Sequence, residues 1–270
     1  ILIIAGRQAS AEIMFFCPLA IMASYYWLLR DERTKTLAWL VLALVCGLFI
    51  YVPGMVWWLV GAAILMRKKL TAVISELPSW LLSVGVAIFV ILLVPAGLSI
   101  FNEWRLVKDF ALIPAHWPSP IHLLKNLGWM LSSLVVKTPY HSDLITSRLP
   151  ILNIIQIALL AFGSYAMWTA ARSKAIVLAV SVAFSVVAAA INDNINLLIL
   201  GLPAVAIFIA AGVRYLYIEW KGVFPTNPIP RTLAMVLIAC LVLTQLAFGL
   251  SYSLVAWPHS LATKTTYVLK

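Results

Sequence analysis

Long apolar runs with almost no charge fill this sequence, and they constrain its fold more than any other feature. Eight runs stand out, at residues 9–29, 36–51, 54–66, 79–101, 150–171, 175–191, 195–213 and 232–257. A transmembrane helix takes about 20 mostly apolar residues. Charged residues or Pro, Gly and Asn bound the runs, as is typical of helix ends. The sequence therefore predicts an all-α, polytopic helical membrane protein with about eight transmembrane segments.

Composition excludes the soluble alternatives. Of the 270 residues, 64% are apolar or aromatic and 10% are charged, whereas an ordinary soluble domain has roughly 45–50% and about 25%. The net charge of +10 is interpreted as an orientation signal and as an attraction to anionic membrane lipids, with no nucleic acid as partner. Cys17, Cys46 and Cys240 lie far apart in apolar stretches, which favours buried thiols over a disulfide.

The distribution of Lys and Arg predicts the orientation. Basic residues occur in every second connection, at Arg30–Lys35, 67–69, 172–174 and 214–231, whereas the short turns between them have none. Cytoplasmic loops carry the excess of basic residues. We therefore expect a multi-pass protein with Arg30–Lys35 on the cytoplasmic side, and the lack of glycosylation sequons in the outer regions favours a bacterial plasma membrane.

Two parts of this topology need separate interpretation. The runs 36–51 and 54–66 are short, since 13 residues form only about 20 Å of helix, so the pair is either two short crossings or a re-entrant hairpin turning at Pro53-Gly54. The segment 102–149 is a long extracytoplasmic loop. Within it, Ile121 to Val136 is expected to form an amphipathic helix along the membrane surface.

Domain organisation follows from the same runs. Residues 1–270 are expected to form a single transmembrane domain. Because the chain starts inside an apolar run without Met, we interpret it as a fragment that lacks its N-terminal spans.

Ionisable residues near the predicted outer face are the candidates for function. Cations at headgroup depth suit a lipid-linked phosphate, and the carrier-phosphate candidates are Arg7, Lys137, His141 and Arg148. Carboxylates suit acid–base chemistry or a divalent metal ion, which is the one cofactor suggested here; these candidates are Glu12, Glu103, Asp109 and Asp143. Ordinary solvated loops and local ion pairs explain the same residues, and Asp193 between two asparagines is typical of a turn.

Several local sequences together resemble the GT-C superfamily of integral-membrane glycosyltransferases, in its bacterial branch similar to protein O-mannosyltransferases and aminoarabinose transferases. The resemblance rests on Gly6-Arg7-Gln8-Ala9-Ser10-Ala11-Glu12, Tyr51-Val52-Pro53-Gly54, Gly201-Leu202-Pro203-Ala204, Phe224-Pro225-Thr226-Asn227-Pro228 with Arg231, and Tyr252 to Ala256-Trp257-Pro258-His259. The long outer loop with its amphipathic helix adds to it.

This resemblance implies transfer of a sugar from a polyprenyl-phosphate carrier to an acceptor at the extracytoplasmic face. Such enzymes place a catalytic acidic residue in their first outer loop, which would lie upstream of Ile1, so no catalytic residue is assigned. Three alternatives remain open: a transporter or lipid-linked glycan flippase, an O-antigen polymerase or ligase-like enzyme, and a non-catalytic scaffold. Intramembrane charge would favour a transporter, and the centres of the runs are almost free of it.

Overall fold

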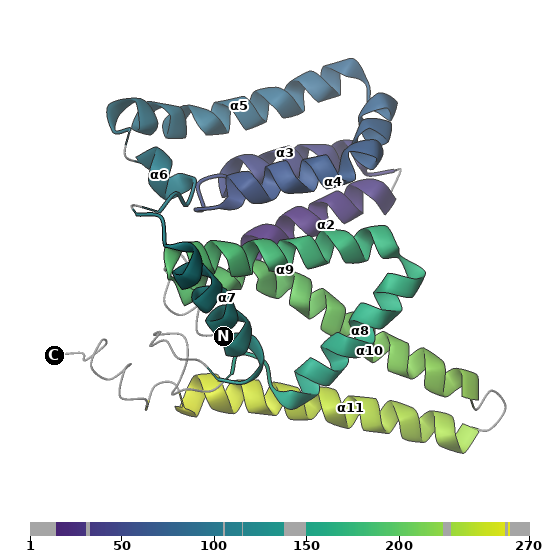
Figure 1. Cartoon of the computed structure of the whole chain (residues 1–270). Helices are drawn as coiled ribbons and strands as arrows, with labels where there is room; N and C mark the ends of the chain where they lie inside the picture. Colours follow the sequence, from purple (N-terminus) through teal and green to yellow (C-terminus); the bar gives the residue numbers. More distant parts are fainter. Residues whose placement is uncertain are drawn as a thin grey trace. The chain divides into compact units, whose positions relative to one another are not determined.

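A computed structural model describes residues 15–30, 33–104, 106–114, 116–137, 150–223, 228–256 and 259. Every regular element in these ranges is a helix (Figure 1), which confirms the predicted all-α class. The chain divides into two compact units, one of described residues up to Ser119 and one from Pro120 onward. We call them the N-terminal and the C-terminal unit.

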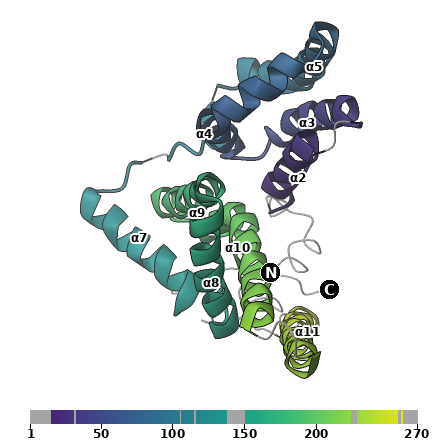
Figure 2. The ribbon, with the colours of Figure 1, turned by 90° about the vertical axis from the view of Figure 1, so that its right-hand side faces the viewer.

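The helix bounds follow the apolar runs closely. The N-terminal unit contains α2 (Phe16–Arg30), α3 (Lys35–Phe49), α4 (Met55–Glu76), α5 (Ser79–Asn102) and α6 (Leu106–Phe110). The C-terminal unit contains α7 (Pro120–Val135), α8 (Ile154–Ala170), α9 (Arg172–Asn192), the 3-10 helix η2 (Ile195–Gly201), α10 (Leu202–Val223), α11 (Pro228–Ser251) and the π-helical turn η3 (Tyr252–Ala256). Figure 2 shows α7 on one side of α8–α10 and α11 on the other.

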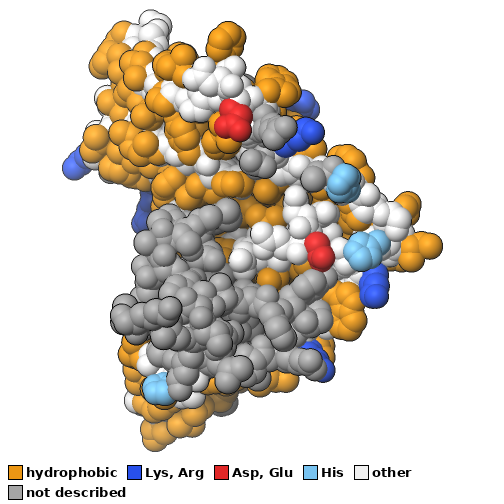
Figure 3. All heavy atoms as spheres, turned by 90° about the vertical axis from the view of Figure 1, so that its left-hand side faces the viewer, with side chains coloured by type: hydrophobic (Ala, Val, Ile, Leu, Met, Phe, Trp, Pro, Cys, Tyr) orange, Lys and Arg blue, Asp and Glu red, His pale blue; other side chains and the backbone are white. Residues whose placement is uncertain are grey.

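Four helical segments are long and apolar enough to cross a membrane. They are Ser79–Asn102, Arg172–Asn192, Ile195–Val223 and Ile229–Ala256. In an apolar 18-residue stretch of each, only 11% of the residues of the first segment and 6% of the last are buried by protein. Most of their apolar surface must therefore face another apolar medium, as in lipid. Hydrophobic side chains also dominate the described surface in Figure 3. The shorter apolar helices are Lys35–Phe49 and Ile154–Ala170.

The two short runs predicted at 36–51 and 54–66 form a helical hairpin of α3 and α4, and the two helices differ in composition. Gly54 provides the turn with φ 82°, a conformation that only glycine adopts without cost. An ion pair between Lys35 and Glu76 joins the start of α3 to the end of α4. Helix α4 runs ten residues beyond the apolar run that ends at 66, because Leu70, Val73 and Ile74 continue a helical apolar pattern after the basic triplet.

Close helix contacts in the N-terminal unit occur at glycines that face large side chains. A Cβ on Gly85 would lie 2.2 Å from Nε1 of Trp39, and that nitrogen donates a 3.1 Å hydrogen bond to the carbonyl of Leu81. The Tyr51 hydroxyl donates to the carbonyl of Leu92 on α5. This bond joins the residues that follow α3 to α5.

The predicted amphipathic helix is present as α7, and its buried side combines polar with apolar residues. Asn126, Met130, Ser133 and Leu134 are buried, and the Asn126 side chain donates a 3.1 Å hydrogen bond to the carbonyl of Ala190 on α9. The apolar face is left outside: Ile121, Leu124 and Leu131 are 84%, 72% and 55% exposed. A helix that buries amide and hydroxyl groups and exposes leucines is arranged for an apolar surrounding.

The C-terminal unit is held together by small residues. Helices α8 and α10 cross (Figure 1), and Gly163 and Gly212 lie where their backbones are in contact. A Cβ on Gly163 would lie 1.7 Å from the carbonyl oxygen of Phe208, and one on Gly212 would lie 2.1 Å from that of Leu159. The backbones can approach this closely only because both positions lack side chains. Helix α9 contributes a buried Ala and Ser face on which η2 packs through Gly201.

Candidate functional site

Most of the residues proposed as functional lie outside the described residues. This holds for Arg7, His141 and Arg148 among the phosphate candidates and for Glu12 and Asp143 among the carboxylates. Of the remaining three, Lys137 follows α7 in the C-terminal unit, whereas Glu103 and Asp109 belong to the N-terminal unit. The described residues therefore do not combine the predicted cations and carboxylates in one unit.

Glu103 and Asp109 flank a sharp change in chain direction after α5. Glu103 ends α5 with its N–H donating to the carbonyl of Ser99, and its own carbonyl accepts from Leu106 at the start of α6. The side chain of Glu103 is exposed, and Asp109 lies within α6. Two hydrogen bonds hold the chain after Asp109. The N–H of Gly54 donates to the carbonyl of Phe110, and the Trp57 indole donates to the carbonyl of Ala111 at 2.7 Å.

Lys137 lies at the end of α7, where the returning chain closes the helix. Its N–H donates to the carbonyl of Ser132 at 3.1 Å. The N–H groups of Ile151 and Leu152 donate to the carbonyls of Ser133 and Leu134 at 3.0 Å each, so carbonyls that a helix end leaves unpaired have partners. The Lys137 side chain is exposed.

A polar cluster follows at the start of α8. Asn153 and Gln156 form a reciprocal capping box, and the Asn153 amide also donates to Oε1 of Gln245 on α11. The spacing Asn-x-x-Gln before an apolar run is a known sequence signature of a helix start, so the capping box could have been found in the sequence. The partner Gln245 could not, because it lies 92 residues away.

An apolar groove lies between α7, α8, α9 and α10, with a volume of about 520 Å³. Its walls include Val135, Leu160, Trp168, Val182, Val186 and Phe208. Val135 is two residues from Lys137, so the groove reaches the end of α7 that bears this cation. Along α9 the groove extends from Ala175 to Val187, about 18 Å at 1.5 Å per residue. Sequence reasoning did not single out these residues, because apolar side chains are the rule in this chain.

A metal ion would need several of the candidate carboxylates close together. Among the residues that the structure describes, no group of three or more His, Cys, Asp or Glu side chains is placed to hold a metal ion. Glu12, His141 and Asp143 are outside that search. The geometry therefore presents an apolar groove to which Ser164 adds a hydroxyl group, and the exposed Lys137 follows two residues after Val135 of its wall.

Comparison with known proteins adds no relative: no protein family, no curated protein and no solved structure matches this chain. The fold and composition define a helical protein with four candidate membrane-spanning segments.

Proposed function

We propose that this chain is part of a bacterial integral-membrane glycosyltransferase of the GT-C type, which transfers a sugar from a polyprenyl-phosphate carrier to an acceptor at the extracytoplasmic face. In this proposal the chain crosses the plasma membrane about eight times, with Arg30–Lys35 in the cytoplasm. The observation that carries the proposal is the apolar groove whose wall includes Val135, two residues before the exposed Lys137.

The groove suits the carrier's tail. A polyprenyl chain is long and apolar, and walls of Val, Leu, Ala and Phe exclude water from it. The groove opens toward the exposed Leu131 and Val135 of α7, so a tail could enter sideways from lipid. The carrier's phosphate would then remain at headgroup depth, beyond the last turn of α7.

The basic end suits the carrier's phosphate. Lys137 is exposed at the end of α7, and an ammonium group there would stabilise the phosphate as it leaves the sugar. In the reaction, the acceptor oxygen forms a bond to the anomeric carbon of the sugar, while the bond between that carbon and the carrier's phosphate oxygen breaks. The phosphate departs with the electron pair, and a carboxylate takes the acceptor's proton. Glu12, Glu103, Asp109 and Asp143 are the carboxylates available for this role in the sequence.

Filling the groove tests the proposal. Ala183 lines the groove on α9, and Ala183→Phe should block the tail and lower transfer of radiolabelled sugar from a polyprenyl-phosphate sugar about tenfold or more. Ala239→Phe makes the same change on the exposed surface of α11 and should leave transfer unchanged. Lys137→Ala should raise the carrier's apparent KM, and Arg148→Ala tests the second cation.

Equal transfer by wild type, Ala183→Phe and Lys137→Ala, measured with the intact protein in its native membrane, would overturn the proposal. Movement of the labelled carrier across the bilayer without sugar transfer would favour the flippase alternative instead.

A further inference from the structure

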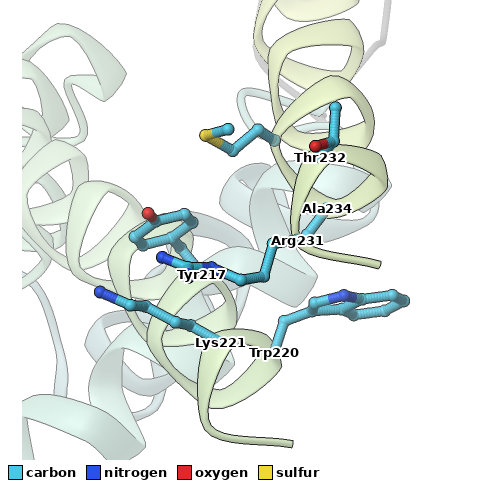
Figure 4. A pocket seen from close by; sticks show the side chains of 7 residues that line it. Tyr217, Trp220, Lys221, Arg231, Thr232 and Ala234 are labelled. Atoms are coloured by element: carbon cyan, nitrogen blue, oxygen red, sulfur yellow. The ribbon is translucent and has the colours of Figure 1, made fainter. Parts of the chain in front are cut away.

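The ends of α10 and α11 form a second hollow, which the proposed glycosyltransferase reaction does not use. It has a volume of about 200 Å³, and Tyr217, Trp220 and Lys221 of α10 line it together with Arg231, Thr232, Ala234 and Met235 of α11. We call it the basic hollow. Figure 4 shows the side chains of Tyr217, Lys221 and Arg231 extending to the same side of the two helices.

Helix geometry fixes this arrangement. Tyr217 and Lys221 are four residues apart on α10 and therefore lie on one face. The Trp220 indole donates a 2.9 Å hydrogen bond to the carbonyl of Pro230, which holds the end of α10 against the start of α11. Arg231 follows Pro230 directly, so this bond fixes the start of α11, from which the Arg231 side chain lines the hollow together with Lys221.

The hollow carries two positive charges. Both Lys221 and Arg231 are exposed, and neither forms an ion pair with any residue that the structure describes. The nearest acidic residue in sequence, Glu219, is two positions from Lys221, about 200° around the helix axis, and lies away from the hollow. Tyr217 adds a hydroxyl group that can donate a hydrogen bond to a phosphate oxygen.

Its position relative to the apolar segments indicates where the ligand comes from. The candidate spans Ile195–Val223 and Ile229–Ala256 both end at this hollow, which places it at the level of the lipid headgroups. Leu233 and Val236 just beyond it are 51% and 50% exposed, so acyl chains can lie against α11 while a headgroup occupies the hollow. Basic pockets between spanning helices are suited to anionic headgroups.

We propose that the basic hollow binds the phosphate group of an anionic phospholipid. Lys221 and Arg231 contact the phosphate oxygens, Arg231 through the paired N–H groups that suit them, and Trp220 packs at the interface between headgroup and acyl chain. The site lies apart from the groove at α7, and it requires no sugar carrier.

Native mass spectrometry of the full chain in detergent, with equal amounts of phosphatidylglycerol and phosphatidylcholine, tests this site. The wild type should retain phosphatidylglycerol preferentially, and Lys221→Gln with Arg231→Gln should lower its apparent affinity about tenfold or more. The matched control, Arg67→Gln with Lys69→Gln, removes the same charge from two exposed positions of α4 and should keep the preference. The exchange Lys221→Arg with Arg231→Lys keeps both charges and should also retain the lipid.

Three results would overturn the proposal. The first is unchanged lipid preference in the double Gln variant when the exchange variant shows that the fold is intact. The second is an equal loss in the α4 control, which would indicate attraction by total charge alone. The third is displacement of the lipid by millimolar inorganic phosphate, which would identify a site for free phosphate.

Discussion

The side-chain amide of Asn126 donates a hydrogen bond of 3.1 Å to the backbone carbonyl of Ala190, and this bond ties α7 to α9. The acceptor lies in the last turn of α9, whose final residue is Asn192. Asn126 is 4% exposed. An amide of this kind gains most from its partner where water is absent, since no solvent can replace the bond.

Loss of this bond should weaken the C-terminal unit. Asn126→Ala is expected to lower the free energy of unfolding by about 1 kcal/mol, in the range measured for side-chain hydrogen bonds between membrane helices. Lys125→Ala changes the exposed neighbour and serves as the control. Thermal unfolding in detergent measures both, and equal melting temperatures for the two variants would contradict this role of Asn126.

The crossing of α8 and α10 should be intolerant of any side chain. Gly163→Ala forces a Cβ against the Phe208 carbonyl, so the helices must separate, at a cost of about 1–3 kcal/mol. The control is Gly222→Ala in α10. It has no atom within 4 Å of the new Cβ and should be neutral or slightly stabilising. Circular dichroism during heating distinguishes them, and a Gly163→Ala protein as stable as Gly222→Ala would contradict the packing described.

The turn after α9 should depend on the backbone conformation of Asp193. Its φ of 49° is left-handed, and Asn and Gly accept this conformation whereas Val does not. Asp193→Val should cost about 1–2 kcal/mol, and Asp193→Gly should be tolerated. If sugar transfer were lost in Asp193→Gly at unchanged stability, the carboxylate itself would have a function.

Labelling of single cysteines can decide between two crossings and a re-entrant hairpin for α3 and α4. The Lys35–Glu76 ion pair places both helix ends together. If the pair crosses twice, a membrane-impermeant maleimide should reach Val52→Cys and Ser75→Cys from opposite sides of the membrane. Cys17, Cys46 and Cys240 are replaced by Ala in the background protein. Labelling of both positions from the same side would establish the re-entrant form.

Much of the secondary structure was predictable because hydropathy is a local property. The run 79–101 corresponds to Ser79–Asn102, and the amphipathic pattern from Ile121 to Val136 corresponds to Pro120–Val135. The Pro53-Gly54 turn was also predicted, since few residues other than glycine adopt a positive φ. The extension of α4 to Glu76 was missed, because three basic residues in a row were interpreted as the end of an apolar segment.

The sequence by itself determined that this chain is helical and apolar enough for a membrane, and it nominated residues near helix ends for function. Only the tertiary structure decided which side of α7 is buried and that Gln245 meets Asn153. It also decided that an apolar groove lies between α7, α8, α9 and α10 and that a hollow is lined by Lys221 and Arg231. The physical reason is that hydropathy records the medium a segment prefers. A groove depends on the distances and angles between helices, and here residues far apart in the chain, such as Gly163 and Gly212, set them.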